Sequence, residues 1–97
     1  MKIVINSCHG GFSLSEQAQK LFCQYSMIKW NDWEKDWSYY DIDRNDQHLV
    51  RIVEELGDGA NGRFAELKVV DIPDEVEWQI DEYDGLEWVA EKHRTWR

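Results

Sequence analysis

Between residues 71 and 91 the chain carries nine carboxylate side chains and neither lysine nor arginine. Apolar and polar residues alternate in Val76-Glu77-Trp78-Gln79-Ile80-Asp81, a pattern typical of a strand with one face in water. Asp84-Gly85, a dipeptide that favours tight turns, then leads into the apolar run Leu86-Glu87-Trp88-Val89-Ala90. The stretch therefore predicts a β-hairpin that keeps one face in water.

The turn of this hairpin decides which side chains share a face. A two-residue turn at Asp84-Gly85 would mix apolar and charged residues on both faces, which conflicts with one-sided burial. A three-residue loop, Tyr83-Asp84-Gly85, with a bulge at the glycine would instead pair Ile80 with Trp88 on one apolar face. We expect the three-residue loop.

In that register the outer face of the hairpin is acidic. Glu77 would lie opposite Glu91, and Asp81 opposite Glu87. Like-charged pairs of this kind destabilise a sheet by the same order as good pairs stabilise it, roughly 0.2–1 kcal/mol each. A sequence selected for stability alone would more often place a lysine or arginine opposite.

Two amphipathic patterns predict helices. Ser13 and Glu16 form an S-x-x-E capping pattern, and apolar residues follow from Leu14 at helical spacing. A second pattern begins at Asn45 or Asp46 and ends at Gly57, a residue that tolerates a left-handed cap.

With 97 residues, the chain is expected to form a single domain, residues 1–97. We predict an α+β fold, a mostly antiparallel sheet of about four strands with two helices on one face. The strands are expected at residues 2–6, 67–72, 76–82 and 86–92, and the helices at residues 14–25 and 46–56. No signal peptide or apolar run of spanning length is recognisable, so we expect a cytoplasmic protein.

The charge balance narrows the possible partners. Twenty Asp and Glu against 11 Lys and Arg give a net charge of -9. Such a surface repels phosphate backbones and anionic lipids, so direct binding to nucleic acid or membrane is not expected. A second acidic region, residues 31–58, has a net charge of -6. It overlaps an aromatic-rich segment, residues 30–41, which we interpret as a loop, with at most a short edge strand at residues 37–42.

The sequence carries no recognisable motif for catalysis, for a metal or for a cofactor. The loop Cys8-His9-Gly10-Gly11 precedes a helix but lacks a phosphate-binding motif, and Leu14 stands where a cysteine-dependent phosphatase needs arginine. The cysteines and histidines show no metal-ligand spacing, and the acids of residues 41–46 lack the glycine and glutamate of a calcium loop. We expect no enzyme, no cofactor, no metal site, and reduced thiols at Cys8 and Cys23.

The charge pattern favours a decoy that imitates a nucleic-acid backbone and binds a basic, nucleic-acid-binding protein. The expected contacts are the acids of both regions: Asp32, Glu34, Asp36, Asp41, Asp43, Glu77, Asp81, Glu87 and Glu91. An acidic run can also be no more than a solvated surface. Two other classes stay open: a binder of a nucleotide signal that uses the Gly10-Gly11 turn and the aromatics, and a thiol enzyme based on Cys8.

Parts of the chain resemble small acidic proteins encoded by phages and prophages. The likeness includes Asn6-Ser7-Cys8-His9-Gly10-Gly11 within residues 2–15, Tyr83-Asp84-Gly85-Leu86-Glu87-Trp88 within residues 82–96, and residues 44–62. Length and acidity are also similar to those of anti-CRISPR proteins that act on type I-F surveillance complexes, some of which imitate DNA. The resemblance implies an inhibitor of host defence in the bacterial cytoplasm with a CRISPR surveillance complex as its partner, and it carries over no functional residue.

Overall fold

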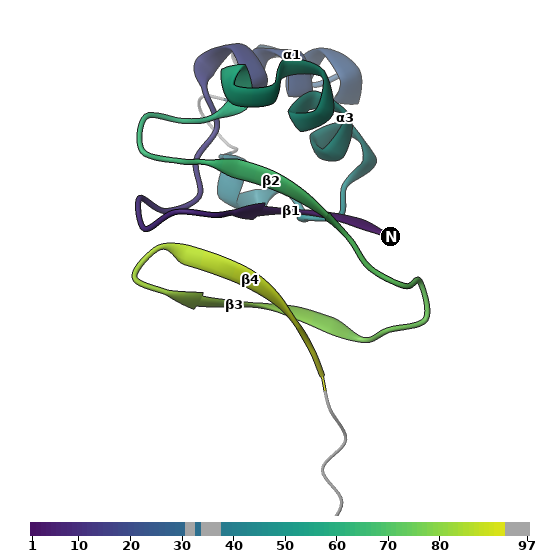
Figure 1. The fold of residues 1–97 in the computed structure, drawn as a ribbon. Coiled ribbons are helices and arrows are strands. Elements are labelled where there is room, and N and C mark those ends of the chain that lie inside the picture. The colour runs from purple at the N-terminus through teal and green to yellow at the C-terminus, as the bar shows by residue number, and fades with distance from the viewer. Residues whose placement is uncertain (31–32, 34–37, 93–97) are drawn as a thin grey trace, which may run out of the picture.

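The computed structural model describes residues 1–30, 33 and 38–92 (Figure 1). Within these ranges the fold is α+β, as predicted. The strands are β1 (Lys2–Asn6), β2 (Leu67–Asp71), β3 (Trp78–Tyr83) and β4 (Leu86–Glu91), the α-helices are α1 (Glu16–Ser26) and α3 (Gln47–Leu56), and the 3₁₀ helices are η1 (Tyr39–Asp41) and η2 (Gly57–Ala60).

The four strands form two antiparallel pairs, β1 with β2 and β3 with β4. Lys2 pairs with Asp71 in the first, and Trp78 with Glu91 in the second. β4 lies alongside β1, so the strands follow one another as β2, β1, β4 and β3 in Figure 1. The expected single sheet of about four strands is not confirmed, because no backbone ladder joins β1 to β4 among the described residues.

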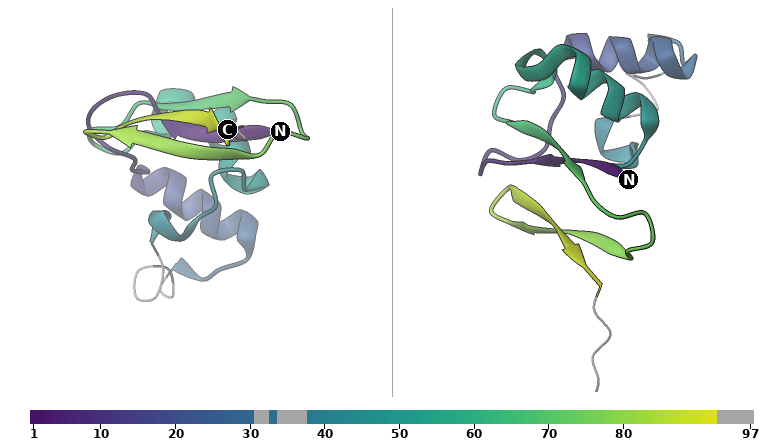
Figure 2. Two further views of the ribbon diagram at one scale, coloured as in Figure 1. Left: turned by 90° about the horizontal axis from the view of Figure 1, so that it is seen from below. Right: turned by 45° about the vertical axis from the view of Figure 1, so that its right-hand side comes forward.

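The core lies between the helices and the β1–β2 pair. α1 and α3 cover one side of this pair, and the β3–β4 hairpin lies on the other (Figures 1 and 2). Val4, Leu49 and Ile52 are fully buried, and the ring of Trp33 packs against Phe22 of α1 with centroids 5.5 Å apart. The hairpin therefore lies at the end of the molecule away from the helices (Figure 1).

α1 begins later than predicted. Its N-cap is Ser15, whose Oγ accepts a hydrogen bond from the Ala18 amide at 3.1 Å, so the predicted capping box of Ser13 with Glu16 is wrong. The preceding residues run extended beside residues 60–62: Leu14 bridges to Asn61, and the Gly62 amide donates to the Ser13 carbonyl at 3.0 Å. This pairing holds residues 13–15 out of the helix.

The start and end of α3 are confirmed. The Asp46 carboxylate accepts from the amides of His48 and Leu49 at 2.8 and 3.2 Å, which satisfies two free donors of the first turn. The helix ends at Gly57, whose φ of 55° is one that glycine adopts without strain.

The predicted hairpin register is wrong. β3 and β4 are joined by a two-residue turn, Asp84-Gly85, with φ of 50° and 89° at its two positions. Positive φ at both positions gives a type I′ turn, whose twist matches that of the strands. This register places charged and apolar residues on both faces, and the ion pair between Arg44 and Glu87 stabilises the charged residue that points inward.

The short edge strand expected at residues 37–42 is also wrong for its described part. Residues 39–41 form η1, which begins with a capping box between Ser38 and Asp41. Trp37 lies outside the described residues.

Candidate functional site

The acidic hairpin, residues 71–92, carries four of the predicted contacts: Glu77, Asp81, Glu87 and Glu91. Its turn rests against the loop that follows β1. Asn6 Nδ2 donates to the carbonyls of Gly85 at 2.8 Å and Cys8 at 2.7 Å, and His9 Nδ1 lies 3.3 Å from the Asp84 carbonyl. A Cβ atom at Gly85 would collide with the backbone of residues 9 and 11, so glycine is required there.

A buried ion pair ties the hairpin to the rest of the molecule. Arg44 donates to both carboxylate oxygens of Glu87, with Nη1 to Oε1 at 2.6 Å and Nη2 to Oε2 at 2.8 Å. Glu87 is only 9 % exposed, and the Arg44 guanidinium lies 3.6 Å from the ring centroid of Phe12. Glu87 was expected as an exposed contact, and that expectation is wrong because its charge is neutralised inside the protein.

Arg44 and Glu87 also occupy the edge of β1 that faces away from β2. The Asn6 amide donates to Glu87 Oε1 at 2.8 Å, and the Val4 amide donates to the Arg44 carbonyl at 2.8 Å. These are the β1 donors that point away from β2. Arg44 and Glu87 thus take the positions that the backbone of a neighbouring strand would fill, which explains why β4 lies beside β1 without a ladder.

The register places a carboxylate opposite each tryptophan of the hairpin. Trp78 pairs with Glu91, and Trp88 pairs with Asp81. Since alternate residues project to opposite faces, the two pairs lie on different faces of the hairpin. The predicted common acidic face of Glu77, Asp81, Glu87 and Glu91 is therefore wrong, because Glu87 and Glu91 project to the face opposite to that of Asp81.

The face of Asp81 and Trp88 points away from β1. Tyr83 on this face is 71 % exposed and Trp88 is 42 % exposed. The like-charged pair that the register does create, Glu82 opposite Glu87, is relieved by Arg44. The sequence therefore mixes acids with aromatics on the outer face rather than pairing acid with acid.

Most carboxylates of the hairpin have no cationic partner among the described residues. Besides Glu87, the exceptions are Asp71 and Asp74, which pair with the Met1 amino group at 3.4 and 2.5 Å. The hydrogen bond that the Met1 amino group donates to Asp74 raises the pKa of the amino group and lowers the pKa of the Asp74 carboxyl. No ion pair in the described part of the chain joins the remaining six, which we call the open carboxylates: Glu75, Glu77, Asp81, Glu82, Asp84 and Glu91.

The other predicted acids do not lie on the hairpin. Asp41 and Asp43 are exposed and, together with Asp46, line a separate pocket of about 260 Å³. No residue of the hairpin lines this pocket. Asp41 accepts from the Ser38 amide at 2.9 Å and Asp46 caps α3, so both carboxylates serve local structure. Asp32, Glu34 and Asp36 were also expected contacts and lie outside the described residues.

The loop after β1 has a packing role. A Cβ atom at Gly10 would collide with the carbonyl of Phe64, and Gly11 has a φ of 88°. The Cys8 thiol donates to the same Phe64 carbonyl at 3.0 Å, and none of its hydrogen bonds in the described residues involves a histidine. Cys8 and Cys23 are free thiols, and burial raises the pKa of Cys23.

The described residues contain no cluster of three or more His, Cys, Asp or Glu side chains placed to hold a metal ion. Nor does any helix there have the length and apolar character needed to cross a bilayer.

Comparison with known proteins adds no assignment. No family model matches the chain, and neither the curated proteins nor the solved structures include a significant match to it. The resemblance to phage-encoded inhibitors stays a prediction.

Arg44, which anchors the acidic hairpin through Glu87, was not indicated by the sequence. It is 43 residues from its partner Glu87, and no local pattern links the two. The sequence did contain an indication that Trp78 pairs with Glu91, because Asp84-Gly85 is typical of a two-residue turn and such a turn produces this pairing.

Proposed function

We propose that this protein is a non-catalytic inhibitor that presents the acidic hairpin to the cationic groove of a nucleic-acid-binding protein. The observation that carries the proposal is the set of six open carboxylates of the acidic hairpin, three of which, Asp81, Glu82 and Glu91, lie on its two-stranded ladder. The Arg44–Glu87 pair supports it by fixing that ladder to the core, so that little conformational freedom is lost when a partner binds.

Charge explains how such a protein would compete. Attraction between an acidic and a basic surface speeds association and weakens with salt, as does binding of a nucleic-acid backbone. The exposed Tyr83 and Trp88 would add contact area, since these residue types are enriched at binding hot spots. The resemblance to phage proteins makes a CRISPR surveillance complex the first partner to test.

The test is competition for a labelled DNA duplex bound to a type I-F surveillance complex, followed by fluorescence anisotropy. We expect the protein to displace the duplex, and we expect the triple variant Glu75→Gln, Glu77→Gln, Glu82→Gln to compete at least about tenfold more weakly, the effect of roughly 1.4 kcal/mol. The matched control is Glu16→Gln, Glu54→Gln, Asp58→Asn, which changes net charge equally but leaves the hairpin intact.

Two results would contradict the proposal. Equal loss of competition in both triple variants would mean that net charge alone matters and that the hairpin is not the contact. Tight, stoichiometric uptake of a nucleotide in calorimetry, with no displacement of the duplex, would favour the nucleotide binder instead.

A further inference from the structure

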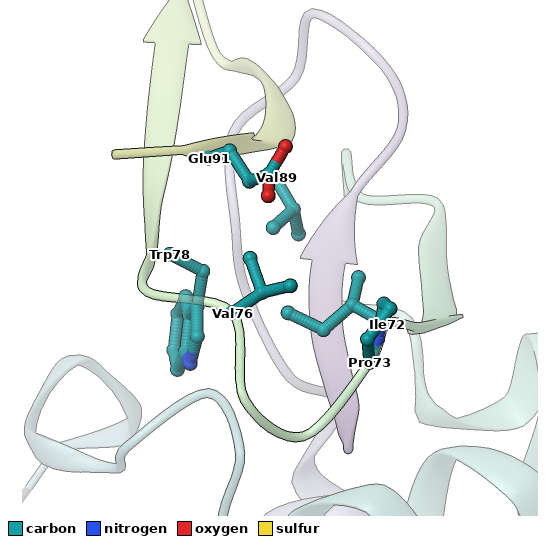
Figure 3. Close-up of a pocket in the computed structure, with 6 residues that line it drawn as sticks. All are labelled: Ile72, Pro73, Val76, Trp78, Val89 and Glu91. Carbon is teal, nitrogen blue, oxygen red and sulfur yellow. The ribbon is translucent and has the colours of Figure 1, made fainter. Parts of the chain in front are cut away.

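A pocket beside the acidic hairpin combines apolar walls with an indole ring and a carboxylate (Figure 3). Its volume is about 310 Å³. The lining side chains come from the β2–β3 connection and from both hairpin strands: Ile72, Pro73, Val76, Trp78, Val89 and Glu91.

The backbone ladder fixes the two chemically distinctive members of this pocket. The Lys92 amide donates to the Glu77 carbonyl at 2.9 Å, so these residues form a hydrogen-bonded pair. The next pair along the ladder, Trp78 with Glu91, is then a non-hydrogen-bonded pair, in which side chains approach most closely, with Cα atoms about 4.5 Å apart. The backbones of these two residues are therefore close neighbours, while in Figure 3 the indole of Trp78 extends away from the carboxylate of Glu91, so that the two groups line different parts of the pocket.

The rest of the pocket is aliphatic. Figure 3 shows Ile72, Val76 and Val89 converging on one space, with the carboxylate of Glu91 on the same side of the hairpin. Glu91 is exposed and is one of the open carboxylates. A ligand that fits must bury an apolar stem and carry positive charge at its end.

An arginine side chain has both properties. Its methylene stem can lie against aliphatic walls while its guanidinium stays at the rim. There it can pair with a carboxylate through two hydrogen bonds and stack on an indole ring, which lysine does less well. An anion would be repelled by the open carboxylates, and a neutral apolar group would cover Glu91 without pairing it.

We propose that this pocket binds one arginine side chain of the basic partner and thereby sets where the hairpin docks. The proposal rests on the function proposed above, but it can be tested without the partner.

The probe is N-acetyl-arginine methylamide, titrated into the ¹⁵N-labelled full chain. The indole Nε1–H resonance of Trp78, assigned from its loss in Trp78→Phe, should shift with saturation, whereas the neutral N-acetyl-norleucine methylamide should leave it in place. Glu91→Gln should weaken binding about tenfold. The control Glu77→Gln removes the same charge next to Trp78 but outside the pocket, and should weaken binding less than about twofold, as expected for screened surface charges.

Equal effects of Glu91→Gln and Glu77→Gln would overturn the proposal that the pocket binds arginine, since the affinity for the probe would then depend on charge alone. This outcome would not affect the result of the duplex competition. Binding that tightens several-fold in Arg94→Gln, Arg97→Gln would mean that an arginine of the same chain fills the pocket, which would overturn the assignment to a partner. Saturable binding together with failed duplex competition would support the pocket and contradict the proposed function.

Discussion

Arg44 joins three parts of the molecule through one side chain and one carbonyl. Its guanidinium neutralises Glu87 and stacks on Phe12, and its carbonyl accepts from Val4 of β1. Removing one partner of a buried ion pair is more costly than replacing both, because the remaining charge has lost its solvent and its counterion.

We therefore predict that Glu87→Gln lowers the free energy of unfolding by about 3 kcal/mol. The double variant Arg44→Met, Glu87→Leu should lose less than the sum of the two single changes, because no isolated charge remains. Urea unfolding followed by tryptophan fluorescence measures both.

The control is Glu82→Gln, which changes the exposed carboxylate directly opposite Glu87 and should alter stability by less than about 0.5 kcal/mol. A loss in Glu87→Gln no larger than in this control would show that the ion pair does not anchor the hairpin.

At the scale of elements, the hairpin depends on a turn that also makes a tertiary contact. Gly85 has positive φ and touches the backbone of the loop after β1, whereas Gly57 has positive φ with open space around it. The two glycines thus separate the cost of backbone strain from the cost of a collision.

We predict that Gly57→Ala lowers the free energy of unfolding by about 2 kcal/mol, because a φ of 55° with a ψ of -127° is a conformation that residues with a Cβ atom rarely adopt. Gly85→Ala should cost about 3 kcal/mol, since the added Cβ atom also forces the turn away from residues 9–11. Thermal unfolding of the two variants gives the comparison. A cost of only about 1 kcal/mol for Gly85→Ala, the strain of a left-handed residue alone, would mean that the turn does not rest on this loop.

At the scale of the whole molecule, a net charge of -9 opposes folding. Like charges repel most when the chain is compact, and on the hairpin the open carboxylates lack ion-pair partners in the described residues. Salt screens this repulsion, with a Debye length that falls from about 30 Å at 0.01 M to about 8 Å at 0.15 M.

The thermal midpoint should therefore rise as monovalent salt is added from about 0.01 to 0.15 M. The variant Glu75→Gln, Glu77→Gln, Glu82→Gln should start from a higher midpoint and respond less to salt. Differential scanning calorimetry at several salt concentrations checks this. A midpoint that falls with salt in the unaltered protein would show that attractive pairs outweigh repulsion.

Sequence patterns determined the local elements of this protein. The apolar spacing and Asp46 cap define α3, and alternation defines the hairpin strands, because both depend on residues a few positions apart. The concentration of carboxylates in residues 71–91 was also evident from the sequence. From these patterns alone follow the α+β class and an acidic hairpin as the candidate surface.

Tertiary contacts determined which face of the hairpin points inward and where α1 begins. A charged Glu87 can point inward because Arg44 meets it there, and Ser15 rather than Ser13 caps α1 because residues 13–15 pair with residues 60–62. Both outcomes depend on groups more than 40 residues apart, whose meeting no local pattern encodes. The free energy of a buried charge is set by its surroundings, and only the folded chain supplies them.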